Sequence, residues 1–502
     1  MQLFIQGLAV VCSPITLVFM CVGTVVGIIF GAVPGLSSVM AISLFLPATY
    51  GMDPAVGISV LIALYIGSVS GGLISAILLK IPGTPASIAT CYDGKPMLDK
   101  GEGMKALGGG IVFSFIGTLI SVLALIFIAP SLASVAINFG PCEYFAISIF
   151  SLMLIATLSS GNMVKGIFAG ILGIAFSTVG IAPVDSVKRF TFGFVQLSSG
   201  FNTLTVLIGL FAVTEVIKIA ETSRYSSKEK IAQVNTKCRG FGFSLKEFAE
   251  QVPNMLLSAL VGLGIGILPG IGAGTSNMVA YTISKNVSRH PEKYGTGIFD
   301  GIVASETANN ASVGGAMIPL LCLGIPGDGV TALLLGAFMV HGITPGPLLF
   351  TNQAPMVYTL FAACIIANIL MLIFEFFGLR IFIKLLNVPK YMLLPIVFVL
   401  CVVGAYALNS RMFDVYTVIL FGAIGYLFSK FKVPTGPMVI GFILGSMAET
   451  NFRRGMMLTD GNFMGFFGKP IAAAFIILTI GYFVYVVISN VRKANKKSGA
   501  KA

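Results

Sequence analysis

Long stretches without a single charged side chain constrain the fold of this chain more than any other feature of its sequence. They include residues 1–52, 54–79, 106–142, 251–284, 329–374, 391–410 and 470–491. A helix needs about 20 apolar residues to cross a bilayer, and in lipid it must satisfy its own backbone hydrogen bonds. The stretches therefore predict an all-α polytopic membrane protein with about 11 to 14 membrane-embedded helical pieces.

The composition excludes an ordinary soluble protein. The 502 residues are 56% hydrophobic and 10% charged, whereas a soluble domain carries about 25% charged residues. The N-terminal stretch lacks the basic start of a signal peptide, so we expect a retained first helix. The eight cysteines occur singly, without a CxxC pair. This indicates core residues rather than disulfides or metal ligands, and no cofactor or metal site is expected.

The basic residues behind the net charge of +12 gather in the segment 221–250 and in the C-terminal tail. The positive-inside rule places both in the cytoplasm. No nucleic-acid partner is expected, because no RNA-binding module accompanies the charge. The hydrophilic segment also divides the chain. We predict a first membrane repeat (1–220), a basic cytoplasmic linker (221–250), a second membrane repeat (251–465), and a C-terminal helix with a basic tail (466–502).

Three short motifs recur in the same order in the two halves. The first half has Gly-Ala-Val-Pro-Gly (31–35), Ser-Gly-Gly (70–72) and Ile-Pro-Gly (81–83). The second half has Gly-Ile-Leu-Pro-Gly (266–270), Val-Gly-Gly (313–315) and Ile-Pro-Gly (325–327). Their nearly constant separation predicts two internal repeats with broken or re-entrant helices. Secondary carriers commonly hold their substrate between two such repeats. The sequence leaves open whether the repeats are inverted.

The Pro-Gly pairs predict helix breaks, because proline lacks an N–H and glycine exposes backbone. Small polar residues follow each break, where a new helix would start and its free N–H groups would favour a carboxylate. The alternative is that small residues merely allow close helix packing. We predict a site for an anion with more than one carboxylate, formed by Pro34, Gly35, Ser37, Ser38, Thr84, Ser87, Thr275, Ser276 and Asn277.

A second polar group contains Glu306, Asn309, Asn310 and Asp328. Such residues beside membrane segments are expensive unless they line a path or bind an ion. We predict that Asn309 and Asn310 bind substrate and that Glu306 and Asp328 couple transport to sodium or protons. A loop-end Glu and an exposed turn Asp are the alternative. Lys80 either attracts the anion or extends to an interface, and we favour the interface.

Several of these motifs together resemble the large membrane subunit of the tripartite tricarboxylate transporter family. They are Gly-Ala-Val-Pro-Gly-Leu (31–36), Ile-Pro-Gly-Thr-Pro-Ala-Ser (81–87) with Asp93-Gly94, Ala-Asn-Asn-Ala (308–311), Leu-Gly-Ile-Pro-Gly (323–327) and His-Gly-Ile-Thr-Pro-Gly-Pro (341–347). The resemblance spans the chain from about Gly23 to the C-terminal helix. It implies a bacterial inner-membrane uptake system with a periplasmic solute-binding protein and a small four-helix membrane subunit. It also implies drive by a sodium or proton gradient, and the chain has no P-loop.

The chain departs from the expected family pattern near the predicted site. Ser37-Ser38 stands where Gly-Pro is expected, Ser305 where Pro is expected, and Lys95 where an aromatic residue is expected. These changes favour a carboxylate other than citrate. A passive anion channel or a structural membrane assembly subunit is the alternative function. An enzyme is not expected, because the chain has neither an HExxH nor a GxSxG motif.

Overall fold

The computed structural model describes residues 2–158, 163–222, 240–385 and 393–499. These residues form two compact units, Met1–Ala136 with Leu204–Tyr426 and Ile137–Thr203 with Leu427–Ala502. Each unit therefore takes segments from both halves of the sequence. Most of the predicted basic linker, including Arg224, Lys228, Lys230, Lys237 and Arg239, lies outside the described residues.

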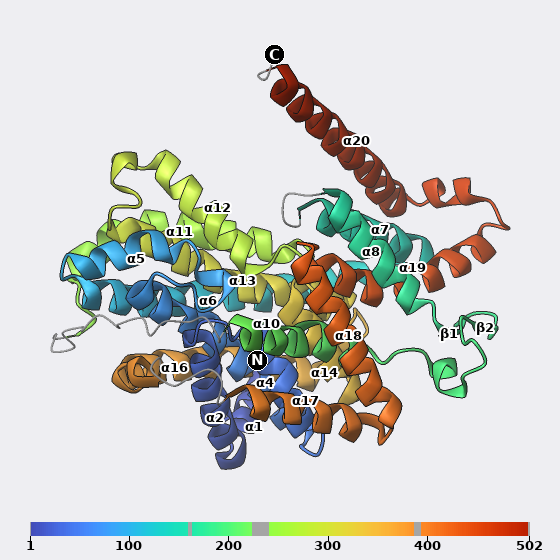
Figure 1. The fold of residues 1–502 in the computed structure, drawn as a ribbon, viewed down its shortest axis with the longest axis horizontal. Coiled ribbons are helices and arrows are strands. Elements are labelled where there is room, and N and C mark those ends of the chain that lie inside the picture. The colour runs from blue at the N-terminus through green and yellow to red at the C-terminus, as the bar shows by residue number, and fades with distance from the viewer. Residues whose placement is uncertain (1, 159–162, 223–239, 386–392, 500–502) are drawn as a thin grey trace. The chain divides into compact units, whose positions relative to one another are not determined.

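The first unit is built of helices alone (Figure 1). In chain order they are α1 (Gln2–Val11), α2 (Pro14–Ala32), α3 (Ser38–Phe45), η1 (Leu46–Thr49), α4 (Pro54–Leu79), η2 (Pro85–Ser87), α5 (Thr90–Asp99), α6 (Gly103–Ala136), α9 (Thr203–Leu207), the π-helical η4 (Ile208–Val213), α10 (Thr214–Thr222), α11 (Leu245–Ile267), α12 (Gly272–Val287), η6 (Pro291–Lys293), α13 (Phe299–Leu323), α14 (Gly329–Val340), α15 (Leu349–Asn352), α16 (Ala354–Leu385), α17 (Leu393–Asn409) and α18 (Met412–Lys430), whose last residues belong to the second unit.

Among the described residues, eight helices are long and apolar enough to cross a membrane, and six more apolar helices have 10–17 residues. This confirms the prediction of an all-α polytopic membrane protein. The broken helices follow from the local sequence. Gly35 and Gly270 adopt φ angles of 93° and 76° directly after a proline, a left-handed conformation that glycine adopts at little cost. Helices α2 and α11 therefore end at these Pro-Gly pairs, and α3 and α12 begin a few residues later.

Helices α2 and α4 run parallel and in close contact. A Cβ atom on Gly27 would lie 2.4 Å from the Leu64 carbonyl oxygen, and one on Gly31 would lie 2.3 Å from that of Ser68. The matching residue numbers rise together along the two helices. Because α2 and α4 point the same way, the intervening α3 must return toward the end at which α2 began. The pair α2–α3 is thus a re-entrant hairpin.

Helices α11 and α13 have the same relationship in the second half. A Cβ atom on Gly262 would lie 2.2 Å from the Ala308 carbonyl oxygen, and one on Gly266 would lie 2.6 Å from that of Ser312. These helices are also parallel, so α12 returns to the end at which α11 began. The pair α11–α12 is a second re-entrant hairpin.

The two half-bundles run in opposite directions. Tyr65 of α4 bonds to Asp328, which follows α13, whereas Val69 accepts a hydrogen bond from Asn309 inside α13. Residue numbers therefore rise along α4 as they fall along α13. The hairpins α2–α3 and α11–α12 accordingly enter the first unit from opposite ends. The internal duplication itself remains a prediction, which this antiparallel correspondence of elements supports.

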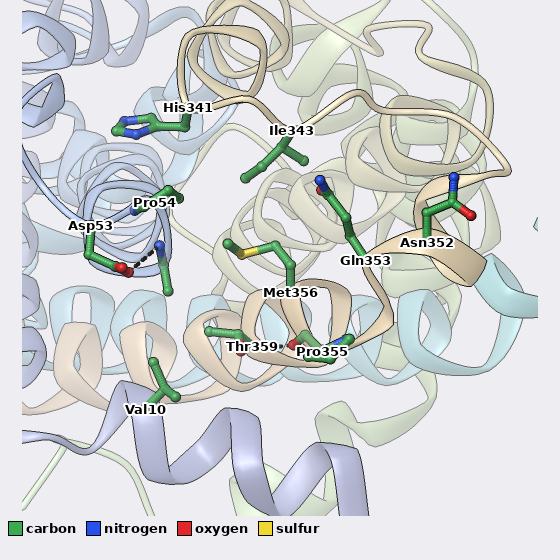
Figure 2. A pocket seen from close by; sticks show the side chains of 11 residues that line it. Val10, Asp53, Pro54, His341, Ile343, Asn352, Gln353, Pro355, Met356 and Thr359 are labelled. Carbon is green, nitrogen blue, oxygen red and sulfur yellow. Dashed lines mark hydrogen bonds between the residues drawn. The ribbon is translucent and has the colours of Figure 1, made fainter.

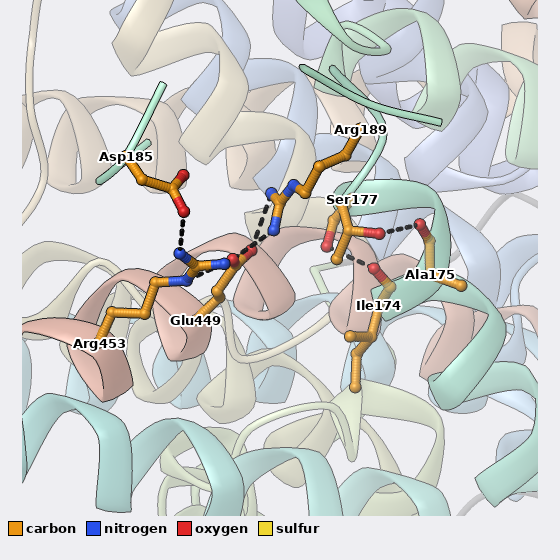
Figure 3. Close-up of polar contacts among 8 residues, drawn as sticks. Ile174, Ala175, Ser177, Asp185, Arg189, Glu449 and Arg453 are labelled. Atoms are coloured by element: carbon orange, nitrogen blue, oxygen red, sulfur yellow. Dashed lines mark hydrogen bonds and ion pairs between the residues drawn. The ribbon is translucent and has the colours of Figure 1, made fainter. Parts of the chain in front are cut away.

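The second unit contains α7 (Pro141–Leu158), α8 (Met163–Ser177), η3 (Val195–Ser199), α19 (Thr435–Leu458), η8 (Phe463–Gly468) and α20 (Pro470–Gly499), with β1 (Gly180–Ile181) paired antiparallel to β2 (Lys188–Arg189). An ion-pair network holds this hairpin to α19 (Figure 3). Arg189 binds both carboxylate oxygens of Glu449. Arg453 bonds to Asp185 at 2.6 Å and to Glu449 at 2.9 Å. The hydrogen bond from Arg453 lowers the pKa of the Asp185 carboxyl.

Candidate functional site

The starts of four helical segments meet inside the first unit. They are α3 and η2 from the first half, and α12 and α14 from the second. A Cβ atom on Gly329 would lie 3.4 Å from Val39, so α14 starts beside α3. One on Gly274 would lie 3.1 Å from the Pro85 carbonyl oxygen, so α12 starts beside η2. The start of each hairpin's second helix therefore lies beside a helix start from the other half of the chain: α3 beside α14, and α12 beside η2.

Further contacts join the Pro-Gly motifs within each half of the chain. In the second half, the Gly270 N–H donates to the Gly327 carbonyl at 2.6 Å. In the first half, Gly83 lies so close to the Gly31 carbonyl oxygen that an added Cβ would be 2.0 Å from it. The Pro-Gly turns that the sequence singled out are therefore in direct contact within each half.

The predicted residues Thr84 and Ser87 are buried in the turn at η2. The Ser87 hydroxyl donates to the Thr84 carbonyl at 3.0 Å. Both hydroxyls would lie 3.0 Å from a Cβ on Gly72, so the second Gly of the Ser-Gly-Gly motif makes room for them. This explains why the two motifs of the first half occur together.

Asn277 and Ser276 connect the second hairpin to its surroundings. The Asn277 side chain accepts a hydrogen bond from the Ala89 N–H at 2.7 Å and donates to the Ser305 carbonyl at 3.3 Å. The Ser276 hydroxyl donates to the Ala308 carbonyl at 3.2 Å. Thr275 instead is exposed. The structure thus brings Asn277 next to the η2 turn, and it places Thr275 on the other face of α12.

The first hairpin uses its predicted serine as a cap. The Ser37 hydroxyl accepts a hydrogen bond from the Met40 N–H at 3.2 Å, which satisfies one free donor at the start of α3. Ser38 is buried and Pro34 lies in the break. At α12 the corresponding residue, Ile271, provides no side-chain cap. The start of α12 therefore has no side chain capping its first N–H groups, as an anion-binding helix end requires.

A buried polar stripe runs along α13. Glu306 accepts hydrogen bonds from the hydroxyls of Thr90 and Ser114. The Asn310 amide donates to the Ser114 hydroxyl at 2.8 Å and to the Glu306 carbonyl at 3.0 Å. Glu306 is fully buried, so the alternative of a loop-end Glu is wrong for this residue. Polar groups this deep in an apolar bundle are costly and are typical of functional sites.

Two amide oxygens of this stripe have no hydrogen-bond partner. The Asn309 amide donates to the Val69 carbonyl at 3.5 Å, but its Oδ1 is buried and unpartnered. The Asn310 Oδ1 is in the same condition. Buried polar atoms without partners are rare in native proteins, and each one is a candidate acceptor for a bound group. These oxygens are acceptors, so they fit a cation or a donor group rather than a carboxylate oxygen.

Asp328 has a clear structural role. Its Oδ1 accepts hydrogen bonds from the N–H and hydroxyl of Thr331 at 2.8 and 2.7 Å, which caps α14. Its Oδ2 accepts a hydrogen bond from Tyr65 at 3.0 Å. Asp328 is half-buried rather than an exposed turn residue. Its carboxylate lies at the meeting of the helix starts, beside Gly272.

Asp93 is a structural residue that the sequence reasoning noted only as part of a motif. Its Oδ1 accepts hydrogen bonds from the N–H groups of Gly295, Gly297 and Ile298 at 2.7–3.0 Å. Its Oδ2 accepts one from Tyr281 at 2.7 Å. The carboxylate thus ties α5 of the first half to α12 and the start of α13.

A pocket of about 490 Å³ opens elsewhere in the first unit, next to the start of α4 and the end of α14 (Figure 2). Asp53 and His341 lie on one side of it, and Gln353 and Met356 on the other. Burial lowers the pKa of His341, and nearby Asp53 partly offsets the effect. The predicted site residues do not line this pocket. Lys80 is exposed at the end of α4.

Taken by class, the chain is a polytopic membrane protein with the broken-helix architecture of a solute carrier. A model of the tripartite tricarboxylate transporter TctA family matches residues 17–440. The chain therefore belongs to the tripartite tricarboxylate transporter TctA family and is a membrane transport component.

Two relatives come from Agrobacterium vitis. An uncharacterised 52.8 kDa protein in the TAR-I ttuC' 3' region is 33% identical over 98% of this chain and 97% of its own length. An uncharacterised protein in the TAR-II ttuC' 3' region is 35% identical over 45% of this chain and 94% of its own length. No solved structure matches the chain.

Proposed function

We propose that this chain is the large membrane subunit of a binding-protein-dependent secondary transporter that imports di- or tricarboxylates using a sodium or proton gradient. The family implies partner subunits. We assign them as a small four-helix membrane subunit and a periplasmic solute-binding protein. We place the chain in the bacterial inner membrane, with the C-terminal tail in the cytoplasm.

The observation that carries the proposal is the meeting of four helical segment starts: α3 and α12 from the two hairpins of opposite direction, and η2 and α14 that follow α4 and α13. Helix starts present N–H groups and the positive end of the helix dipole, which favour an anion. The uncapped start of α12 beside the η2 turn is the best-placed part of this group. Thr84, Ser87 and Asn277 line that junction, and we assign them to the substrate site together with Ser37 and Ser38.

Coupling is assigned to the buried polar stripe of α13. Glu306 is fully buried and receives hydrogen bonds from the hydroxyl groups of Thr90 and Ser114. Movement of one part of each repeat against a fixed remainder would then expose the site alternately to the two sides. Asp328 contributes to coupling through its position at the helix starts.

The test is uptake of a labelled carboxylate panel into proteoliposomes that contain this chain and its small membrane partner. Uptake is measured with and without the binding protein, under sodium and proton gradients. We expect saturable uptake that requires the binding protein and one of the two gradients. Uptake that ignores gradients would instead establish a passive channel. No uptake by folded, fully assembled protein would contradict the assigned substrate class.

A further inference from the structure

Glu375 lies in the middle of the long apolar helix α16 and is fully buried. Its Oε2 accepts a hydrogen bond from the Ser70 hydroxyl of α4 at 2.5 Å. Its Oε1 is buried and has no hydrogen-bond partner. The hydrogen bond joins α16 to α4.

A second buried carboxylate, Glu306, lies one helical turn before Asn309 on α13, and Asn309 donates to the carbonyl of Val69, next to the Ser70 that donates to Glu375. The polar groups that face the pair are neutral. Ser70 faces Glu375, while Thr90, Cys91, Ser114 and Asn309 face Glu306. None of the ion pairs found among the described residues includes either carboxylate. Two negative charges in a dry bundle interior without a cation would be severely destabilising.

Two further buried amide oxygens without a hydrogen-bond partner lie on α13 and α16. The Asn309 amide donates to the Val69 carbonyl, one residue before Ser70, and its own Oδ1 is unpartnered. Asn368 lies two turns before Glu375 on the same face of α16. Its amide donates to the Phe115 carbonyl at 2.9 Å, and its Oδ1 is also buried without a partner. Carboxylate, amide and hydroxyl oxygens are the ligands of hard cations.

The two protonation states of Glu375 balance its charge in different ways. An ionised carboxylate has a free Oε1 that needs a cation. A protonated carboxyl satisfies the charge balance directly, and the proton is then the bound cation. We propose that Glu375, supported by Ser70 and Asn309, holds a monovalent cation, either a sodium ion or a proton, inside the first unit.

This assignment rests on the proposed function only in making the bound cation the coupling ion. The binding itself is testable without transport. Purified full-length protein is unfolded by heat in sodium-free choline buffer, with sodium chloride added stepwise. In a parallel series, sodium-free buffer is varied between about pH 7 and pH 9, above the range in which His341 titrates. A cation that binds only the folded state raises its melting temperature.

The variants are Glu375→Gln, which neutralises the carboxylate without changing its shape, and Ser70→Ala, which removes its only hydrogen-bond donor among those described. Glu102→Gln changes an exposed carboxylate and is the control. We expect the wild type and the control to respond to one cation. Glu375→Gln should lose that response, and Ser70→Ala should need at least about tenfold more cation, equivalent to about 1.4 kcal/mol.

A response to sodium assigns a sodium site, and a response to pH alone assigns a proton site. A full wild-type response in Glu375→Gln overturns the proposal, and so does a wild type that responds to neither cation. The Ser70→Ala result keeps the proposal testable if Glu375→Gln does not fold. Normal cation binding by a protein that transports no carboxylate would contradict the proposed function but would still support the cation site.

Discussion

At the scale of single residues, the buried carboxylates of the first unit differ in how their oxygens are satisfied. Both oxygens of Asp93 are fully used, by three backbone N–H groups and one tyrosine hydroxyl. Glu375 instead keeps one oxygen free. Complete satisfaction is typical of a structural role, whereas an unpartnered buried oxygen is typical of a binding role.

Asp93→Asn tests the structural role of that carboxylate. The amide replaces an acceptor oxygen with a donor that faces either backbone N–H groups or the tyrosine. We expect the free energy of unfolding to fall by about 3 kcal/mol, because several hydrogen bonds to a charged group are weakened. The measurement is thermal unfolding of the purified protein. Asp99→Asn, which alters an exposed ion pair with Lys95, should cost less than about 1 kcal/mol; equal losses in both variants would contradict the assignment.

His341 gives the protein a predictable pH dependence. Its pKa is lowered in the folded state, so the unfolded chain binds more protons as the pH falls through the ordinary histidine range. Stability is therefore fully present above about pH 6.5 and is lost as the pH decreases below it. His341→Gln should remove this part of the acid destabilisation. Thermal unfolding between about pH 5 and pH 8 checks it, with His290→Gln, an exposed histidine, as the control that should behave as wild type.

At the scale of elements, close helix packing through glycine decides where the hairpins lie. Gly262 and Gly264 are two residues apart on α11. A Cβ on Gly262 would lie 2.2 Å from the Ala308 carbonyl oxygen, whereas nothing lies within 4 Å of one on Gly264. The same residue type is therefore essential at one position and free at the other.

Gly262→Ala should destabilise the protein by about 1–3 kcal/mol, because α11 must move away from α13. Gly264→Ala should be neutral or stabilising by up to about 1 kcal/mol, since alanine favours the helix. Melting temperatures of the two purified variants provide the test. Equal effects of the two substitutions would show that α11 does not pack on α13 as described.

The ion pairs of the second unit set the position of its β hairpin. Glu449 receives hydrogen bonds from Arg189 and an ion pair from Arg453. Glu449→Gln should loosen the hairpin, so hydrogen exchange at the Ala182 amide, which donates to the Val187 carbonyl across the hairpin at 2.9 Å, should become about tenfold faster. Arg454→Gln changes an exposed neighbour and should leave the exchange rates unchanged. Unchanged exchange in Glu449→Gln would contradict a role for this network in holding the hairpin.

The sequence predicted the helical membrane class and the positions of the helix breaks, because both depend on local chemistry. Charge-free stretches and Pro-Gly pairs carry that information directly. It did not predict that Asp93 joins α5 to α12 and the start of α13 by hydrogen bonds, since its partner Tyr281 is 188 residues away. Nor did it predict Glu375 as a binding residue, because only the fold places Ser70 opposite it and leaves Oε1 free. Thr275 belongs to the group of small polar residues after the second Pro-Gly pair, as the sequence predicted. It lies on a different face of α12 from the buried Ser276 and Asn277, so it is exposed.

At the scale of the whole molecule, the question that the sequence left open was the relative direction of the halves. The contacts of α4 with α13 show that they are antiparallel within the first unit. The second unit takes one segment from each half, which no sequence boundary indicated. Two hairpins of opposite direction that meet at one group of helix starts resemble the repeat arrangement common in secondary carriers.

Uptake by the asparagine variants tests this account most directly. Asn309→Ala and Asn310→Ala are reconstituted with the small membrane subunit and the binding protein, beside Asn286→Ala, which alters an exposed residue at the end of α12. We expect gradient-driven carboxylate uptake to fall at least about 100-fold in the first two variants, with folded protein retained, and to stay at the wild-type level in the third. This loss corresponds to about 2.7 kcal/mol. Normal uptake by both Asn309→Ala and Asn310→Ala would contradict a transport site at the buried stripe of α13.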